Sequence, residues 1–289
     1  MWAVLAIIAG MMNAAALEVN KTYKFQGLTL VFWRSCASTL MLLPFLFLME
    51  WPQNAVFYMS VLIMAIASVI GLMVQFNLAS KHNGRVANLS QPISIIGTFI
   101  IWLALDQAEQ LRFISDFWYA AGVFISFGLM IGALQFIRKN DTSWEAFLAI
   151  APIGLLYAAS TVLTKLMLDE GTGALAISLT WVFIGNIMMA FTALPVLMSQ
   201  KIGDKNKAFM PKRILEASFL SGILHTASWV MFNYAMILSI NPSYPTLVIA
   251  LTPIWFALYY KCRGIQDNVS PFAGMVLAFS AILLMIVTL

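Results

Sequence analysis

Residues 10–21 read Gly-Met-Met-Asn-Ala-Ala-Ala-Leu-Glu-Val-Asn-Lys, and residues 154–165 read Gly-Leu-Leu-Tyr-Ala-Ala-Ser-Thr-Val-Leu-Thr-Lys. The two stretches align without gaps and share the first glycine, two alanines and the closing lysine. Each ends a long apolar run, so each is expected to form the second half of a membrane-spanning helix. The match predicts that the chain contains one structural unit twice.

The composition places the chain in a membrane. Its 289 residues are 62% hydrophobic and 10% charged, with a mean hydropathy of +0.89, which a soluble surface cannot carry. The apolar runs are too long and too evenly apolar for barrel strands. We therefore expect an all-α integral membrane protein with ten transmembrane helices, at about 2–20, 27–50, 55–80, 84–105, 116–138, 144–168, 174–199, 213–239, 242–262 and 269–289.

Three more matches follow in the same order in both halves. They are Val74–Ala79 with Val230–Ala235, identical at four of six positions, Pro92 with Pro253, and Leu43-Pro44 with Leu194-Pro195. Because five is odd, a tandem five-helix unit enters the membrane from opposite sides in its two copies. The sequence thus predicts two inverted repeats, residues 1–140 and 141–289, an architecture of alternating-access carriers that bind substrate near the midplane.

The chain resembles the EamA branch of the drug/metabolite transporter superfamily. The resemblance covers nearly the whole chain and rests on the two five-helix halves, the small-residue runs ending in Lys21 and Lys165, and the prolines Pro92 and Pro253. It implies a carrier, often an exporter, of amino acids, sugars, nucleotide derivatives or other metabolites. We expect a secondary or facilitative transporter of amino acids or similar small polar metabolites.

Charge predicts the orientation. Basic residues gather in alternate gaps between the apolar runs, whereas the opposite gaps hold only Arg112 among several acidic residues. The positive-inside rule then places both termini outside the cytoplasm. The first run has no basic segment before it and has a counterpart in the second half, so it is interpreted as a mature helix and not as a signal peptide. The compact chain favours a bacterial inner membrane.

Two equivalent positions in the repeat lie eight residues before the closing lysines. They are Asn13 and Tyr157, both polar at membrane depth. Small multidrug members of the resembling superfamily carry a proton-coupling glutamate at that spacing, and asparagine cannot exchange a proton. Asn13 and Tyr157 are therefore candidates for neutral contacts with substrate, the alternative being hydrogen bonds that hold helices together.

Helix 213–239 carries His225, Trp229 and Asn233 at four-residue spacing, so the three share one face. His225 titrates near neutral pH in its unperturbed form and would couple transport to protons; a neutral histidine joining two helices is the alternative. Asn233 has the repeat partner Asn77, which favours a common role in packing or gating. Trp229 is a candidate for substrate stacking or for packing alone.

The fourth predicted helix has Asn88 and Gln91 on one face before Pro92. A proline inside a helix removes a backbone hydrogen bond and frees a carbonyl, so this region is a candidate substrate or hinge site, with Pro253 as its counterpart. A kink without further function is the alternative. Arg34 would hold an anionic group, reach the membrane surface, or pair with Glu18. It aligns with Gly185 in the second half and so breaks the repeat.

Other classes of protein find little support. Cys36 and Cys262 lack the spacing of a metal site, so no metal or cofactor is expected, and the basic residues form no patch for nucleic acid. No enzyme motif is present. The alternatives to a transporter are a receptor or assembly factor without flux, and a membrane enzyme acting on a lipid with His225 as base. Gly128 and Gly132 form a GxxxG that predicts either a homodimer face or close packing within one chain.

Overall fold

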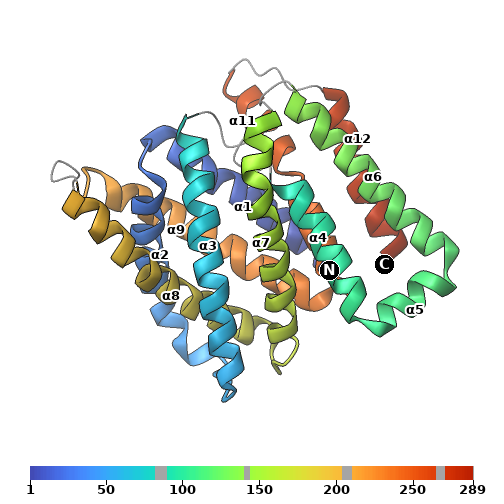
Figure 1. Ribbon diagram of the computed structural model, residues 1–289, viewed down its shortest axis with the longest axis horizontal. Coiled ribbons are helices and arrows are strands. Elements are labelled where there is room, and N and C mark those ends of the chain that lie inside the picture. The colour runs from blue at the N-terminus through green and yellow to red at the C-terminus, as the bar shows by residue number, and fades with distance from the viewer. Residues whose placement is uncertain (82–89, 140–143, 204–209, 265–270, 289) are drawn as a thin grey trace.

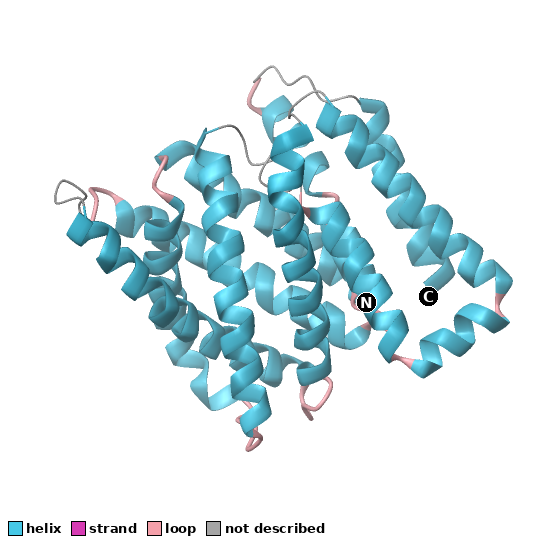
Figure 2. Ribbon diagram, in the orientation of Figure 1, coloured by secondary structure: helices cyan, strands magenta, loops and turns pink. Residues whose placement is uncertain are grey.

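The computed structural model describes residues 1–81, 90–139, 144–203, 210–264 and 271–288. Every regular element within these ranges is helical (Figure 2). The elements are α1 Trp2–Tyr23, α2 Gly27–Leu42, the 3-10 helix η1 Leu43–Leu48, α3 Ala55–Lys81, α4 Gln91–Leu105, α5 Gln107–Ser115, α6 Phe117–Lys139, α7 Trp144–Leu168, α8 Ala174–Gly203, α9 Ile214–Leu238, α10 Ser243–Ile249, α11 Thr252–Cys262 and α12 Pro271–Thr288.

Seven helices in the described ranges are long and apolar enough to cross a membrane, and the number rises to eight if α4 and α5 form one span bent by 99°. The apolar part of α12 is shorter, at Phe272–Thr288. Large apolar side chains face outward, among them Phe47, 82% exposed, and Trp118, 80% exposed. Water would penalise this surface, whereas lipid does not. The protein is thus an all-α, multi-pass membrane protein.

The helices pack through small residues and apolar clusters. α1 lies against α9, where Ser228 donates a hydrogen bond to the backbone oxygen of Ala9 at 2.8 Å. α2 packs against α8 and α9, α3 against α7 and α8, and α4 against α7. α6 and α12 form a pair at one edge of the molecule (Figure 1). The centre is therefore surrounded by helices from both halves of the chain.

Two predicted elements differ from the observed ones, and one observed helix was not predicted. The run 242–262 is divided at Ala250 and Leu251 into α10 and α11, and the run 27–50 tightens into η1 at Leu43 with Pro44 in its first turn. Prolines are tolerated at such helix starts because the first turn has no backbone partner for an N–H. α5 was not predicted: it is too short and too polar to be recognised as a span, and the Asp106 side chain caps its first turn.

The two glycines of the GxxxG have open space beside them. A Cβ added at Gly128 or Gly132 would meet no described atom within 4 Å, so the alternative of close packing within one chain at these positions is wrong. α6 approaches α12 at Gly122 instead, where an added Cβ would lie 3.2 Å from the Cβ of Val287. The homodimer face stays a prediction.

Candidate functional site

A cavity of about 180 Å³ lies between α1, α3, α4, α7, α8, α9 and α10. Of the residues predicted from the sequence, six line it: Asn13, Gln91, Tyr157, His225, Trp229 and Asn233. They come from four helices and from both halves of the chain. The lining contains no Asp, Glu, Lys or Arg among the residues that the structure describes. Its surface therefore combines uncharged polar groups with apolar side chains such as Met64, Leu72 and Phe232.

α9 presents its polar face to the cavity, as its four-residue spacing predicts. The rings of His225 and Trp229 lie with centroids 5.4 Å apart and planes inclined by 47°. Neither amide atom of the buried Asn233 has a hydrogen-bond partner among the described residues, and the same holds for His225 Nε2 and Gln91 Oε1. Unsatisfied polar atoms are costly in a protein interior, so these groups are available to a ligand.

Tyr157 reaches across the space between two helices. It lies on α7, and a Cβ added at Gly71 of α3 would overlap its ring and hydroxyl. Only glycine leaves room for this side chain at that point. The small residue on α3 thus positions an aromatic ring with a hydroxyl at the cavity wall.

Asn77 lies outside the cavity lining. Asn77 accepts a hydrogen bond from the backbone N–H of Gly27 at 2.7 Å and so joins the start of α2 to α3. Asn77 thus has a packing role, whereas Asn233 lines the cavity; their common role in packing or gating stays a prediction. Asn88 falls outside the described residues.

Arg34 is fully buried in α2, which excludes the alternative that it reaches the membrane surface. The predicted pairing of Arg34 with Glu18 is not observed. Glu18 pairs with Lys21 at 3.4 Å and accepts a hydrogen bond from Tyr260 at 2.9 Å. The guanidinium carbon of Arg34 lies 5.4 Å from the centre of the Phe76 ring. Arg34 also interacts electrostatically with Tyr157 and His225, so its charge lies close behind the cavity wall.

Pro92 and Pro253 stand in the first turns of α4 and α11, not inside a helix. The argument that each removes a backbone hydrogen bond is therefore wrong, because the N–H of a first-turn residue has no intrahelical partner. Pro253 follows directly on the break between α10 and α11. A hinge at that break stays a prediction on different grounds, namely the two consecutive non-helical positions Ala250 and Leu251.

Sequence reasoning missed the serine and threonine hydroxyls of the cavity lining and the amide of Gln75. The hydroxyls belong to Ser68, Ser94, Ser160, Thr161, Thr164, Ser228 and Thr246. Serine and threonine are common in membrane helices because they can bond to the preceding turn, as Thr161 does to the backbone oxygen of Tyr157 at 2.8 Å. Their presence alone is thus no signal. Spacing relative to Tyr157 would have found Ser160, Thr161 and Thr164, which lie three, four and seven residues after it.

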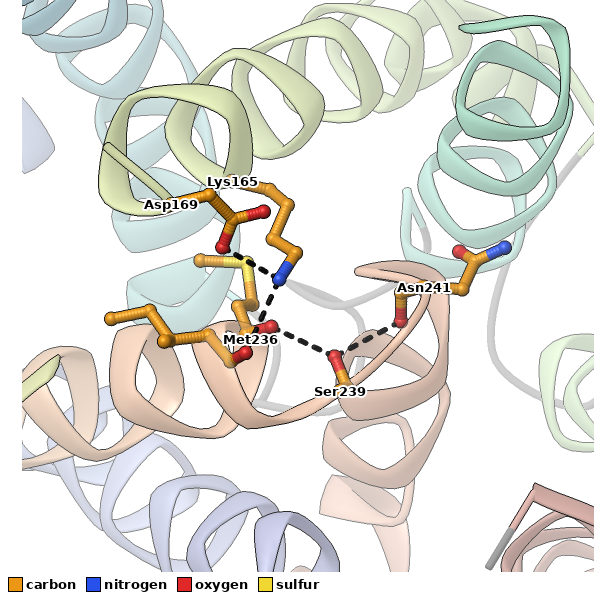
Figure 3. Close-up of polar contacts among 6 residues, drawn as sticks. Lys165, Asp169, Met236, Ser239 and Asn241 are labelled. Atoms are coloured by element: carbon orange, nitrogen blue, oxygen red, sulfur yellow. Dashed lines mark hydrogen bonds and ion pairs between the residues drawn. The ribbon is translucent and has the colours of Figure 1, made fainter. Parts of the chain in front are cut away.

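Lys165 closes one end of the region, next to Thr164 of the cavity lining. It donates to Asp169 at 2.7 Å and to the backbone oxygen of Ile237 at 3.3 Å, while Ser239 donates to the backbone oxygens of Met236 and Asn241 (Figure 3). Burial raises the pKa of the Asp169 carboxyl, and the bond from Lys165 acts against this rise. The end of α7 is thereby attached to the end of α9.

A second buried network adjoins this one. Glu109 of α5 accepts hydrogen bonds from the hydroxyls of Tyr119 at 2.7 Å and Tyr244 at 2.6 Å, and from Asn241 Nδ2 at 3.4 Å. The sequence predicted Glu109 only as an acidic residue of an exposed gap, yet it is 1% exposed. The signal that was missed is an acidic residue in the first turn of a short polar segment between two spans. This network attaches α5 to α6 and α10.

Lys21 of α1 donates a hydrogen bond to the Tyr260 hydroxyl of α11 at 2.8 Å. The two lysines that close the repeated sequence motif thus both join helices, one at the end of α1 and one at the end of α7.

No family model matches the chain, and no curated protein matches its sequence. Solved structures do match its fold. One of them, described only as "Crystal structure of protein", superimposes with a TM-score of 0.61 and 12% identity, over 97% of this chain and 98% of its own. At this identity the likeness concerns the fold alone. The chain therefore shares its overall architecture with a solved protein along nearly its full described length.

Proposed function

We propose that the chain crosses the membrane ten times as two inverted five-helix repeats, residues 1–140 and 141–289. In this arrangement α1, α2 with η1, α3, α4 and α6 correspond to α7, α8, α9, α10 with α11, and α12. The pair α10–α11 then counts as one span, and α5 lies in the gap between the fourth and fifth spans.

The packing of the helices supports this arrangement. Exchanging the two halves turns the α1–α9 contact into α7–α3, the α2–α9 contact into α8–α3, and the α4–α7 contact into α10–α1 and α11–α1, all of which are present. The contacts α2–α8, α6–α12 and α4–α10 exchange into themselves and are also present. Most contacts are kept by the exchange, as a two-fold relation between the halves requires, whereas α7–α8 and α9–α10 have no equally extensive counterpart in the first half.

The function that the site supports best is secondary or facilitative transport of amino acids or similar small polar metabolites, with export as the direction, by alternating access. The observation that carries it is the polar cavity lined by both halves, with unpartnered groups on Gln91, His225 and Asn233. A binding site between two pseudo-symmetric halves lets one half rock against the other around a bound substrate.

The two lysine closures support the same mechanism. Under the inverted arrangement α1 and α7 run in opposite directions, so Lys21 with Glu18 and Tyr260, and Lys165 with Asp169 and Ile237, lie at opposite ends of the molecule. Alternate breaking of such contacts would open the cavity to one side at a time. The proposal also includes the bacterial inner membrane as location and protons as a coupling ion.

Counterflow in proteoliposomes tests the proposal. Vesicles are loaded with a mixed metabolite pool, and mass spectrometry measures which labelled compounds exchange. Exchange of one chemical class is expected. Binding without exchange, from protein shown to be folded, would favour a receptor or assembly factor, and turnover of a lipid in detergent that depends on His225 would favour an enzyme.

A further inference from the structure

The charge of Arg34 has no hydrogen-bonded partner among the described residues. None of its three guanidinium nitrogens has a hydrogen-bond partner within the part of the chain that the structure describes, and its side chain is 0% exposed. Its contact with the Phe76 ring at 5.4 Å is an attraction to the ring face and not a hydrogen bond.

Such an arrangement is unfavourable for the empty protein. Arginine stays protonated in proteins, so it cannot escape the cost by losing a proton. A buried ion without a partner loses its hydration and gains no pairing in return. The empty protein therefore lacks one negative charge in this region, and replacing Arg34 by an apolar residue is expected to make it more stable.

The charge of Arg34 lies behind the cavity wall: α2 contributes no residue to the lining, and the guanidinium carbon lies 5.4 Å from the ring of Phe76, whose neighbour Gln75 lines the cavity. Tyr157 and His225 interact electrostatically with Arg34 and also line the cavity, whose lining includes no acidic residue among the described ones. No described residue supplies a negative charge to Arg34, so a bound ligand is the candidate source. Direct pairing requires a small movement of Arg34 or of its neighbours, because its nitrogens have no exposed surface in the empty cavity.

The second half offers no equivalent group. Gly185 stands at the position aligned with Arg34, and a Cβ added there would lie 3.0 Å from the Trp229 ring. The ring of Trp229 thus fills the space that a second arginine would need. One cation on one side of a pseudo-symmetric cavity orients a ligand that has one charged end.

We propose that the substrate of this cavity carries a single carboxylate, which Arg34 neutralises during binding, while neutral groups such as Asn233 and Gln91 contact the remainder. This rests on the proposed function and names its substrate class. A guanidinium pairs with carboxylate and phosphate alike, but one cation matches the one charge of a carboxylate and leaves a phosphate partly unneutralised.

Thermal unfolding in detergent tests the proposal without requiring transport. The probes are the common amino acids, each compared with its own carboxamide and, for serine, with phosphoserine. At least one amino acid is expected to raise the unfolding temperature of the wild type where its carboxamide does not. Arg34→Met should unfold at a higher temperature than the wild type when empty and should bind the amino acid roughly a hundredfold more weakly, with Arg34→Lys between the two. Lys261→Met, which removes an exposed cation, should leave the binding unchanged.

The outcomes separate the site from the transport. Arg34-dependent binding of a carboxylate without counterflow supports the site and overturns transport. Counterflow that is unaffected by Arg34→Met, or that is confined to compounds without a carboxylate, overturns the site and leaves transport standing. Preference for phosphoserine over serine overturns the single carboxylate. If no amino acid shows Arg34-dependent binding and Arg34→Met unfolds at a lower temperature, Arg34 is a structural residue and the proposal is wrong.

Discussion

His225 is the residue through which pH can act on the cavity. Its Nε2 atom is buried without a described partner, and its ring lies 5.4 Å from that of Trp229. A nitrogen without a partner is free to exchange a proton with a substrate or with water. This arrangement gives less support to the alternative that Nε2 joins two helices.

Replacing His225 by glutamine, which cannot take up a proton, should therefore abolish any dependence of counterflow on pH that arises from this ring. Substrate binding, measured at one fixed pH, should persist because glutamine retains polar atoms at the cavity wall. An unchanged pH profile would remove His225 from proton coupling.

Glu109 is the residue whose loss should affect stability most directly. Its carboxylate accepts bonds from Tyr119 and Tyr244 in a buried site. Hydrogen bonds to a buried charge contribute about 1.5–3 kcal/mol each, so Glu109→Gln should lower the free energy of unfolding by about 2 kcal/mol. Thermal unfolding in detergent measures this. Glu170→Gln, at an exposed position, is the control and should change little; equal effects of the two variants would contradict the prediction.

Single residues were predictable where a polar side chain interrupts an apolar run. That signal found His225, Asn233 and Tyr157, because a polar group at membrane depth usually faces the interior. The same signal did not distinguish Asn77 from Asn233, because the two occupy equivalent positions in the repeat. The hydrogen bond of Asn77 with Gly27, which is distant in sequence, could not be predicted from it. Glu109 was assigned to an exposed gap because burial by α6 and α10 depends on contacts distant in sequence.

At the scale of helices, close approach depends on particular glycines. Gly27 begins α2 directly beside the backbone oxygen of Met73 in α3, and an added Cβ would overlap that oxygen. Backbone cannot move aside as a flexible side chain can. Gly27→Ala should therefore destabilise the protein by about 1–3 kcal/mol, the usual cost of overpacking.

Gly128→Ala is the matched control, because its Cβ would meet open space. Its effect should stay within about 0.5 kcal/mol, as for surface substitutions in general. Unfolding temperatures of the two variants in the same detergent measure the difference. A large effect of Gly128→Ala would instead reveal a contact of that face with a second copy of the chain, as the homodimer prediction requires.

Long apolar runs made most helices predictable to within a few residues, since the bilayer sets their length. The breaks were less predictable. Pro253 lies in the first turn of α11, but the sequence alone does not show whether a proline lies inside a helix or begins one. The Asp106 cap and the contacts of Glu109 stabilise α5, and a hydropathy pattern contains no signal for either of them.

At the scale of the molecule, the orientation and the number of spans can be tested together with one native cysteine. Cys262 is exposed at the end of α11, between Lys261 and Arg263. If α10 and α11 together cross the membrane as one broken span, Cys262 lies on the basic, cytoplasmic side. It should then react with a membrane-impermeant maleimide only after bacterial cells expressing the protein are permeabilised.

Gln53→Cys in a background with Cys36→Ser and Cys262→Ser provides the opposite reference, because Gln53 is exposed in the connection between η1 and α3. Two spans precede it and nine precede Cys262 in the ten-span arrangement, so it should react in intact cells. Labelling of both sites from outside would mean that α10 and α11 do not cross. Because the chain would then have lost the counterpart of α4, such a result would contradict the inverted repeat itself, whereas an exchange of the two patterns would reverse only the orientation.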